Sequence, residues 1–317
     1  MLNVSLRQLR TFATAARHLS FARAAEELHL TAPAVSMQIR DLETAVGLPV
    51  FERSGRTMSL TTTGEYLLVY ARRVMATMKE AEDTVARLRG LQAGRITVGM
   101  VGTAQYFVPR LLAQFRKDYP GIEVRLTVGN RDQLDRLLHD RDIDLAIMGR
   151  PPSELDVRAE AFAANVLGVV ASVDHPLAVE SAIAPARLDR ERFIVRETGS
   201  GTRGAMEAFF REQRIAPVAI MEMDSNETIK QAVIANMGLT LLSLHTLSLE
   251  LQAGQLTVLD VVGLPLRRAW HVVSLGAMSL SPAAEAFRYF VLEQGDAMLE
   301  SLFGTSALVA GDAQRNS

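Results

Sequence analysis

The chain of 317 residues contains no cysteine and no long apolar run. Without thiols it forms no disulfide and has no thiolate chemistry, which fits a reducing cytosol. No stretch approaches the roughly 20 apolar residues that span a bilayer. Arg7 and Arg10 fall where a secretory signal would need its apolar core. We therefore expect a cytoplasmic protein with no membrane partner.

The chain also has little net charge, because 34 Lys and Arg stand against 36 Asp and Glu. Taken over the whole chain, a charge of −2 does not indicate a nucleic-acid partner. The charge is uneven, however: residues 1–90 hold 12 Lys and Arg against 9 Asp and Glu, and the rest hold 22 against 27. This asymmetry modestly favours a nucleic-acid-binding N-terminal part. The length and an apolar content of 48% predict two or three globular domains.

Motifs for catalysis and metal binding are missing as well. The six histidines show no metal-ligand spacing, and no Ser or Asp stands in a recognisable nucleophile motif. Ser200 lies in GSGT rather than in the form G-x-S-x-G, and no phosphate-loop lysine follows it. We therefore expect that the protein is not an enzyme and that it binds neither a metal ion nor a cofactor. An α/β enzyme stays an alternative that turnover lost on changing Ser200 or Arg203 would support.

Residues 20–63 contain two helix starts, a tight turn and a basic hairpin. Ser20 is a good N-cap, and apolar residues at helical spacing predict a helix that ends near Leu28. Thr31 caps a second helix, in which Pro33 is tolerated because first-turn amides have no intrahelical acceptor. Two helices joined by a three-residue turn indicate a helix-turn-helix, whose second helix enters the DNA major groove.

The second helix has two faces. Its apolar stripe, which we assign to the core, consists of Val35, Ile39, Leu42 and Val46. The opposite face carries no acid before Asp41 and consists of Pro33, Ser36, Met37 and Arg40. Small residues and one Arg suit a face that meets base edges.

A hairpin follows the second helix, which Gly47 ends. Residues 50–60 predict two short strands around a turn at Gly55, with Arg53 and Arg56 beside the tip. Arginines on a hairpin next to a recognition helix indicate a winged helix-turn-helix, with contacts to phosphates or the minor groove. The alternative is an ordinary helical hairpin whose arginines are solvated.

This stretch resembles the N-terminal domain of LysR-type transcriptional regulators through SFARAAEELHLTAPAVSMQIRDLE and FERSGRTMSLTTTGE. The resemblance implies that Pro33 and Ser36 approach bases. It departs at Ala32 and Met37, where many members have a polar or basic side chain, so readout would use thymine methyls and DNA shape. The residues expected to contact DNA are Ser20, Arg23, Thr31, Ala32, Pro33, Ser36, Met37, Gln38, Arg40, Arg53 and Arg56.

A long helix is predicted after the hairpin. Thr62 and Glu65 form a possible capping box, and no Gly or Pro interrupts the pattern before Gly90. Apolar residues at a and d positions run through three heptads, too far to be buried against so small a domain. They predict a dimerisation coiled coil and are Leu67, Ala71, Val74, Met78, Ala81, Val85 and Leu88. The alternative is a helix lying on the core of its own chain.

From residue 95 strands and helices alternate, which predicts a mainly parallel sheet covered by helices. The expected strands are residues 96–100, 123–128, 144–148, 166–171, 193–196, 219–223, 239–244 and 270–274. The expected helices are residues 108–119, 133–139 and 282–303. Some 200 residues of this kind suit two α/β lobes with a cleft between them, like the type 2 periplasmic-binding-protein fold of LysR effector domains.

The fold class expected is therefore α + α/β, with a winged helix-turn-helix, a long linker helix and a two-lobed effector domain. The expected parts are a DNA-binding domain at 1–63, a linker and dimerisation helix at 64–89, a hinge at 90–94, an effector domain at 95–304 and a disordered polar tail at 305–317. In the effector domain we expect lobe I at 95–164 and 269–304, and lobe II at 165–268.

Ligands in open α/β sheets bind beyond the carboxyl ends of the strands. The candidates are Gly102, Thr103, Asn130, Gly149, Arg150, Thr198, Ser200, Gly201, Thr202, Arg203 and Asn226. The run TGSGTR at 198–203 is the sharpest signal, because its glycines turn amides inward and the following helix offers its N-terminus to an anion. The alternative is an ordinary Gly-rich turn.

Three more motifs, IMGRPP from Ile147, HPLA from His175 and GSGTR from Gly199, resemble LysR-type regulators of Calvin-cycle operons for carbon dioxide fixation. This resemblance implies an effector among phosphorylated metabolites, such as ribulose bisphosphate or phosphoenolpyruvate, with Arg150 and Arg203 pairing the phosphate. It also implies an activator that binds double-stranded DNA as a dimer or tetramer and acts through RNA polymerase. The alternatives are a LysR-type regulator of another operon responding to a different small anion, and a ligand-binding protein whose N-terminal domain docks a protein partner.

Overall fold

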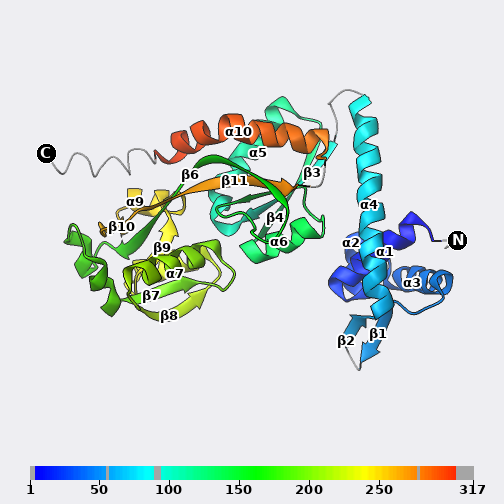
Figure 1. Ribbon diagram of the computed structural model, residues 1–317, viewed down its shortest axis with the longest axis horizontal. Coiled ribbons are helices and arrows are strands. Elements are labelled where there is room, and N and C mark those ends of the chain that lie inside the picture. The colour runs from blue at the N-terminus through cyan, green and yellow to red at the C-terminus, as the bar shows by residue number, and fades with distance from the viewer. Residues whose placement is uncertain (1–3, 55–56, 89–93, 277–278, 305–317) are drawn as a thin grey trace. The chain divides into compact units, whose positions relative to one another are not determined.

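The computed structural model describes residues 4–54, 57–88, 94–276 and 279–304 (Figure 1). It divides into two compact units, residues 1–88 and 89–317. The tail expected at 305–317 lies outside the described residues, as does the hinge expected at 90–94 except for Gly94.

The first unit contains three short helices, a hairpin and one long helix. Ser5, Ser20 and Thr31 cap the three helices, each accepting a hydrogen bond from the amide three residues on. Gly47 ends the third helix in the left-handed region, with φ of 78°. The predicted helix-turn-helix and wing are thus present. The elements are α1 (Leu6–His18), α2 (Phe21–Leu28), α3 (Ala32–Val46), β1 (Phe51–Ser54), β2 (Thr57–Leu60) and α4 (Thr62–Leu88).

Helix α4 begins one residue earlier than the predicted capping box requires. Thr61 is the capping residue, since its hydroxyl accepts the Gly64 amide at 3.0 Å. Thr62 is already helical, so the expected Thr62 cap is wrong. Gly64 is needed there because a Cβ at this position would collide with the carbonyl oxygen of Val50, just before the wing. The start of α4 therefore packs directly against the wing.

One small core holds the first unit together. Val35, Ile39 and Leu42 of α3 are buried, as the predicted stripe requires, and Val46 packs at its edge. Phe12 of α1 contributes a ring that packs edge-on against Phe51 of β1. Burying one side of α3 in this way fixes which side faces outward.

The second unit is a two-lobed α/β structure. Within the described residues its strands form a seven-stranded sheet in the order β10-β6-β11-β5-β3-β4, with β9 pairing to β6, and a separate pair β7-β8. Its strands are β3 (Gly94–Val101), β4 (Ile122–Gly129), β5 (Leu145–Met148), β6 (Val157–Ser172), β7 (Arg192–Arg196), β8 (Val218–Met223), β9 (Thr240–Ser243), β10 (Leu256–Val258) and β11 (Leu266–Leu275). Its helices are η1 (Gly102–Tyr106), α5 (Val108–Asp118), α6 (Arg131–His139), η2 (Pro176–Val179), η3 (Pro185–Arg190), α7 (Gly201–Gln213), α8 (Asn226–Ile234), η4 (Leu244–Thr246), α9 (Ser248–Gln252) and α10 (Pro282–Phe303).

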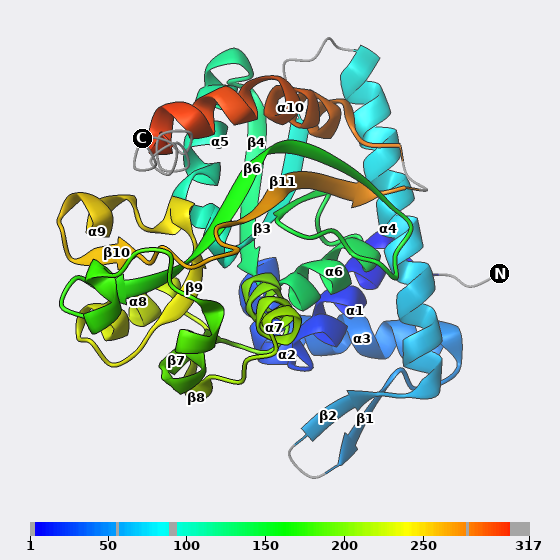
Figure 2. The ribbon, with the colours of Figure 1, turned by 60° about the vertical axis from the view of Figure 1, so that its left-hand side comes forward.

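The prediction of a mainly parallel sheet is wrong. β3 pairs in parallel with β4 and β5, but β6 and β11 run antiparallel to each other over the whole length of β11. The sequence prediction found only the second half of β6, because its first half has a single buried residue, Phe162, while its second half is buried throughout. These two long strands join the lobes (Figures 1 and 2).

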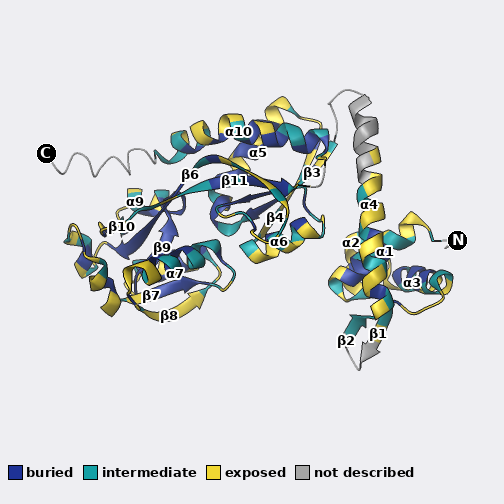
Figure 3. Ribbon diagram, viewed as in Figure 1, coloured by how far each residue is buried: buried dark blue, intermediate teal, exposed yellow. Residues whose placement is uncertain are grey.

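Separate clusters of buried side chains hold the lobes. One cluster packs Phe115 of α5 and Phe287 of α10 against the sheet, so that α10 is buried on one side and exposed on the other (Figure 3). Another packs Phe193 of β7 and Phe209 of α7 with Leu241 of β9. Because β6 and β11 belong to both lobes, a ligand that touches these strands contacts the connection between them.

Candidate functional site

The outward face of α3 carries no acid from Ala32 to Arg40. Pro33, Met37 and Arg40 are exposed, Met37 to 57%, and Ser36 is half-buried between them. Asp41 is the first acid on the helix. A protruding apolar and basic face opposite a fixed core suits insertion into a DNA groove.

The residues around this face have varied surroundings. Thr31 and Ala32 are exposed at the start of α3, and Arg23 is exposed in the first turn of α2, which Ser20 caps. Gln38 is buried instead, and its Oε1 accepts the Thr11 hydroxyl of α1 at 2.7 Å. Gln38 therefore fixes α3 against α1 from the inside.

The two wing arginines cannot be placed. The Arg53 side chain and the whole of Arg56 lie outside the described residues. Their expected contacts to the DNA backbone stay predictions.

The predicted seam of α4 divides into two parts. Leu67 and Ala71 pack into the core of their own unit, and Ala71 is fully buried. Val74 and Met78 are 40% and 38% exposed. Ala81 is exposed as well, while the side chains of Val85 and Leu88 lie outside the described residues. Two exposed aromatic residues that the heptad pattern did not include stand near the seam, namely Tyr66 and Tyr70.

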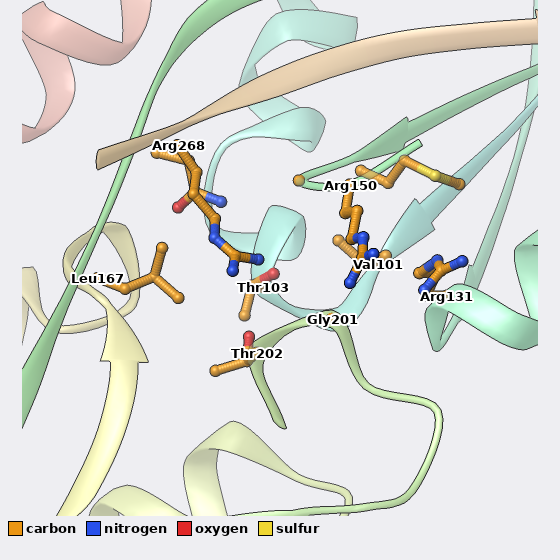
Figure 4. Close-up of a pocket in the computed structure, with 11 residues that line it drawn as sticks. Val101, Thr103, Arg131, Arg150, Leu167, Gly201, Thr202 and Arg268 are labelled. Atoms are coloured by element: carbon orange, nitrogen blue, oxygen red, sulfur yellow. The ribbon is translucent and has the colours of Figure 1, made fainter. Parts of the chain in front are cut away.

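A pocket lies in the second unit, with walls from both lobes and from the connecting strands (Figure 4). The space between the lining atoms amounts to about 380 Å³, part of it open to solvent. Its lining residues are Val101, Thr103, Arg131, Met148, Gly149, Arg150, Asn165, Leu167, Gly201, Thr202 and Arg268.

Three arginines from three different elements line this pocket. Arg131 begins α6, Arg150 follows β5 and Arg268 lies on β11. Burial lowers the pKa of Arg268, and the positive charge of Arg150 lowers it further. Arg131 lies 3.6 Å from Asp135, whereas Arg150 and Arg268 make no ion pair within the described part of the chain. Arg150 and Arg268 thus bring positive charge to the pocket with no carboxylate of the described residues within ion-pair distance, while the charge of Glu212 offsets part of the lowering of the Arg268 pKa.

Hydroxyl and amide donors complete the pocket. Thr103 is buried at 6% exposure, and Gly201 and Thr202 form the first turn of α7, where backbone amides are not used within the helix. In Figure 4 Arg268 points toward Thr103 and Thr202, and the Arg150 side chain points toward Gly201. Charged and neutral donors converging in this way bind an anion with several oxygen atoms.

The structure brings five of the predicted effector residues to this pocket: Thr103, Gly149, Arg150, Gly201 and Thr202. The others have different positions. Asn130 caps α6 in a capping box with Gln133, and Ser200 caps α7. Asn226 is buried, and its Oδ1 accepts the Arg196 guanidinium at 2.6 Å. Gly102 and Thr198 are also absent from the pocket lining.

Arg203 is not among the residues that line the pocket. Its guanidinium donates to Glu207 and Glu222 and to the carbonyl oxygen of Arg196. The hydrogen bond to Glu207 is the main cause of its raised pKa. With two carboxylate partners, Arg203 joins α7 to β8.

The predicted set lacks Val101 and Met148, the last residues of β3 and β5, and it also lacks Arg131, Asn165, Leu167 and Arg268 of the pocket. Arg131 lies two residues beyond the end of β4, so the strand-end rule could have found it. Asn165, Leu167 and Arg268 lie inside β6 and β11, and Asn165 stands opposite Arg268 in the strand register. A search restricted to residues after strands does not reach them.

Among the described residues, no group of three His, Asp or Glu side chains is placed to hold a metal ion. None of the described helices has the length and apolar character needed to cross a membrane.

The described residues thus form a helix-turn-helix unit with an exposed apolar and basic face, and a two-lobed unit whose pocket gathers positive charge and hydrogen-bond donors. Residues 6–65 match the bacterial regulatory helix-turn-helix protein family of the lysR type, and residues 89–296 match the LysR substrate binding domain. The chain therefore belongs to the LysR family of transcriptional regulators.

Relatives and solved structures resemble the chain over most of its length. It is 48% identical to the transcriptional regulator CfxR of Cupriavidus necator, over 95% of both chains. It is also 48% identical to the RuBisCO operon transcriptional regulator of Allochromatium vinosum, over 94% of this chain and 98% of that one. The regulatory domain of Synechocystis CcmR, solved in complex with 2-PG, matches with 40% identity and a TM-score of 0.61, over 63% of this chain and 96% of that one.

Proposed function

We propose that this LysR-type regulator activates Calvin-cycle genes for carbon dioxide fixation in response to a phosphorylated metabolite bound between its lobes. The choice of genes is supported by the 48% identity to CfxR and to a RuBisCO operon regulator over nearly whole chains. The motifs at Ile147, His175 and Gly199 favour the same genes. A regulator that acts on DNA would work in the cytoplasm.

The pocket carries the effector proposal. Arg131, Arg150 and Arg268 converge with two threonine hydroxyls and the first turn of α7, a set that matches a phosphate dianion. Neither Arg150 nor Arg268 has an ion-pair partner among the described residues, so an anion would relieve their mutual repulsion. The complex of the CcmR regulatory domain with 2-PG, at 40% identity, supports a ligand of this kind.

For DNA we propose that α3 enters the major groove with its exposed face. Two copies of the chain would place two such helices on successive grooves about 34 Å apart. The contacting residues proposed are Ser20, Arg23, Thr31, Ala32, Pro33, Ser36, Met37, Arg40, Arg53 and Arg56. The buried Gln38 is left out of this set.

The signal would pass from the pocket to the DNA through oligomer geometry. Effector binding would change the closure of the lobes around β6 and β11, and α4 would convert this into a different spacing of DNA-bound dimers or tetramers. Only an effector with different affinities for the two arrangements could do so. Activation would then proceed through RNA polymerase.

The test is binding of the full chain to the promoter region beside its own gene, at two salt concentrations. The panel of effectors contains ribulose bisphosphate, phosphoenolpyruvate and 2-phosphoglycolate. Affinity that falls steeply with salt, because phosphate contacts release counterions, and that changes with one panel compound would support the proposal. Specific promoter binding that none of the compounds changes would favour a regulator of another operon that responds to a different anion. If the chain does not bind the promoter at either salt concentration, the proposal that it binds DNA is overturned.

A substitution on α3 makes this test specific. Ser36→Glu puts a carboxylate against the groove and should abolish promoter binding while the oligomer stays intact. Ser36→Gln has a similar size without the charge, so it should lose much less affinity. Equal binding by both variants would refute the placement of α3.

A further inference from the structure

The floor of the pocket is formed by the two strands that connect the lobes. Asn165 of β6 and Arg268 of β11 stand opposite each other in the register, and both line the pocket. Leu167 lines it as well, since alternate residues of a strand share a face. Asn165 is only 6% exposed. The direction of its amide therefore decides whether this floor offers a ligand an N–H donor or an oxygen acceptor.

A buried hydroxyl holds the Asn165 amide from behind. Ser243 of β9 is 1% exposed, and its Oγ lies 2.8 Å from Oδ1 of Asn165. The same Oγ lies 3.4 Å from Nδ1 of His245. The single hydroxyl proton of Ser243 thus has two acceptors within reach.

Trp270 decides between these two acceptors. Its indole N–H can only donate, and it points to Nδ1 of His245 at 3.4 Å in a fully buried position. Nδ1 must then carry a lone pair, which places the imidazole proton on Nε2. This requires a neutral ring, and burial lowers the pKa of His245 to about 4. With Nδ1 engaged by Trp270, the Ser243 hydroxyl donates to Asn165.

The orientation of Asn165 follows from this chain of donors. Its Oδ1 is occupied by Ser243, so Nδ2 is directed to the pocket side. Gly149, which lines the pocket, leaves room for it, because a Cβ there would lie 2.7 Å from Nδ2. The floor of the pocket therefore presents an amide donor beside the Arg268 guanidinium.

We propose that Asn165 donates a hydrogen bond from Nδ2 to an oxygen of the bound anion, and that Ser243 is a positioning residue that orients this amide. The proposal rests on the anion pocket of the proposed function. The ligand group above Asn165 would have to be an acceptor, such as a phosphate or carboxylate oxygen. A ligand with an amino group at that place would bind poorly, because its N–H donors would face the N–H donors of the Asn165 amide.

The experiment measures the affinity of the full chain for 2-phosphoglycolate by calorimetry. Ser243→Ala frees the amide to turn and should weaken binding roughly three- to tenfold, the effect of losing one oriented hydrogen bond. Asn165→Ala should weaken it by at least as much. The double variant should bind no more weakly than Asn165→Ala alone, because Ser243 acts through Asn165.

Two controls separate orientation from general damage. Thr240→Val removes another buried hydroxyl of β9, from the other face of the strand, and should leave affinity unchanged. The chain has a single tryptophan, so the fluorescence of Trp270 reports whether each variant is folded around the chain of donors. If Ser243→Ala does not fold, Ser243→Cys takes its place. The thiol is similar in size but a weak hydrogen-bond donor, so this variant should show the same loss of affinity for 2-phosphoglycolate.

The possible outcomes distinguish the two proposals. If the unaltered chain binds none of 2-phosphoglycolate, phosphoenolpyruvate and ribulose bisphosphate, the phosphate pocket itself fails, and the role of Asn165 fails with it. If the unaltered chain binds but a folded Ser243→Ala binds equally well, the positioning role alone is refuted. A further loss on adding Ser243→Ala to Asn165→Ala would show that Ser243 acts through the fold rather than through the amide.

Discussion

Arg268 and Arg203 are two arginines of the effector unit with opposite surroundings. Arg268 lines the pocket, where burial and the charge of Arg150 lower its pKa. We expect Arg268→Gln to reduce affinity for 2-phosphoglycolate roughly tenfold to a hundredfold, as for a lost hydrogen bond between charged groups. Without ligand its thermal stability should be equal or higher, because repulsion between two cations is removed. Calorimetry and thermal unfolding measure the two effects.

Arg203 provides the matched comparison, since its guanidinium is held by Glu207 and Glu222. Arg203→Ala should cost about 1 kcal/mol of unfolding free energy or less, because these carboxylates are half exposed. The affinity of this variant for 2-phosphoglycolate should stay within about twofold of the unaltered chain, because Arg203 does not line the pocket. A twofold change corresponds to less than about half a kcal/mol of binding free energy. A loss of affinity equal to that of Arg268→Gln would return Arg203 to the binding site, as the sequence had suggested.

His245 predicts a dependence of stability on pH. Burial lowers its pKa from 6.5 to about 4, against a smaller opposing effect of Glu300 on α10. Between pH 6.5 and 4, His245 is therefore protonated in the unfolded chain but neutral in the folded chain. Its contribution to the free energy of unfolding is fully present above pH 6.5 and is lost as the pH falls toward 4. The contribution is about 3 kcal/mol for a shift of this size.

The pH effect is measured by denaturant unfolding from pH 7.5 down to 4. His245→Asn keeps an acceptor near Trp270 but does not titrate, so its stability should fall less steeply over this range. Parallel curves for the variant and the unaltered chain would mean that other groups cause the acid sensitivity.

At the scale of elements, the first turns of helix α4 pack into the core of their own unit, and the next turns expose apolar side chains. Leu67 and Ala71 are used by their own unit, so Leu67→Glu should unfold it rather than dissociate an oligomer. Val74 and Met78 are exposed one and two turns further along. We expect Val74→Glu with Met78→Glu to raise the dimer dissociation constant at least a hundredfold, because two carboxylates would be buried in an apolar seam.

Sedimentation at several concentrations checks this prediction. Ala76→Glu adds a carboxylate on the other side of the same helix and serves as the control. A dimer that survives both substitutions at Val74 and Met78 would place the contact elsewhere, with the exposed Tyr66 and Tyr70 as the next candidates.

Local signals explain which elements could be predicted from the sequence. The caps Ser20 and Thr31 and the end at Gly47 depend on neighbours within one turn, so α2 and α3 were placed closely. The direction of β6 depends on partners far along the chain, and its first half has no continuous apolar run to reveal it. The same limit applies to the pocket. Gly149 directly follows a strand, which a local pattern reveals, whereas Arg268 lies inside β11 and reaches the pocket only because β11 pairs with β6.

At the scale of the whole molecule, the effector must favour one arrangement of the lobes over another. Gly199, with φ of 85°, precedes α7, and a Cβ there would lie 2.6 Å from Oδ2 of Asp132 on α6. The two lobes approach each other at this point, and an added methyl group would require the Asp132 side chain to shift. We therefore expect Gly199→Ala to oppose this arrangement, so that promoter binding by the full chain no longer changes when the effector is added.

Strain at a positive φ could produce the same loss, and a second substitution separates the two causes. Asp132→Ala removes the atoms that the new methyl group meets but does not relieve backbone strain, so the double variant should regain the effector response. Gly204→Ala, where no atom lies within 4 Å of an added Cβ, should respond like the unaltered chain. If the double variant stays unresponsive while Gly204→Ala responds, backbone strain rather than contact between the lobes explains the effect, and closure at Gly199 is not part of the switch.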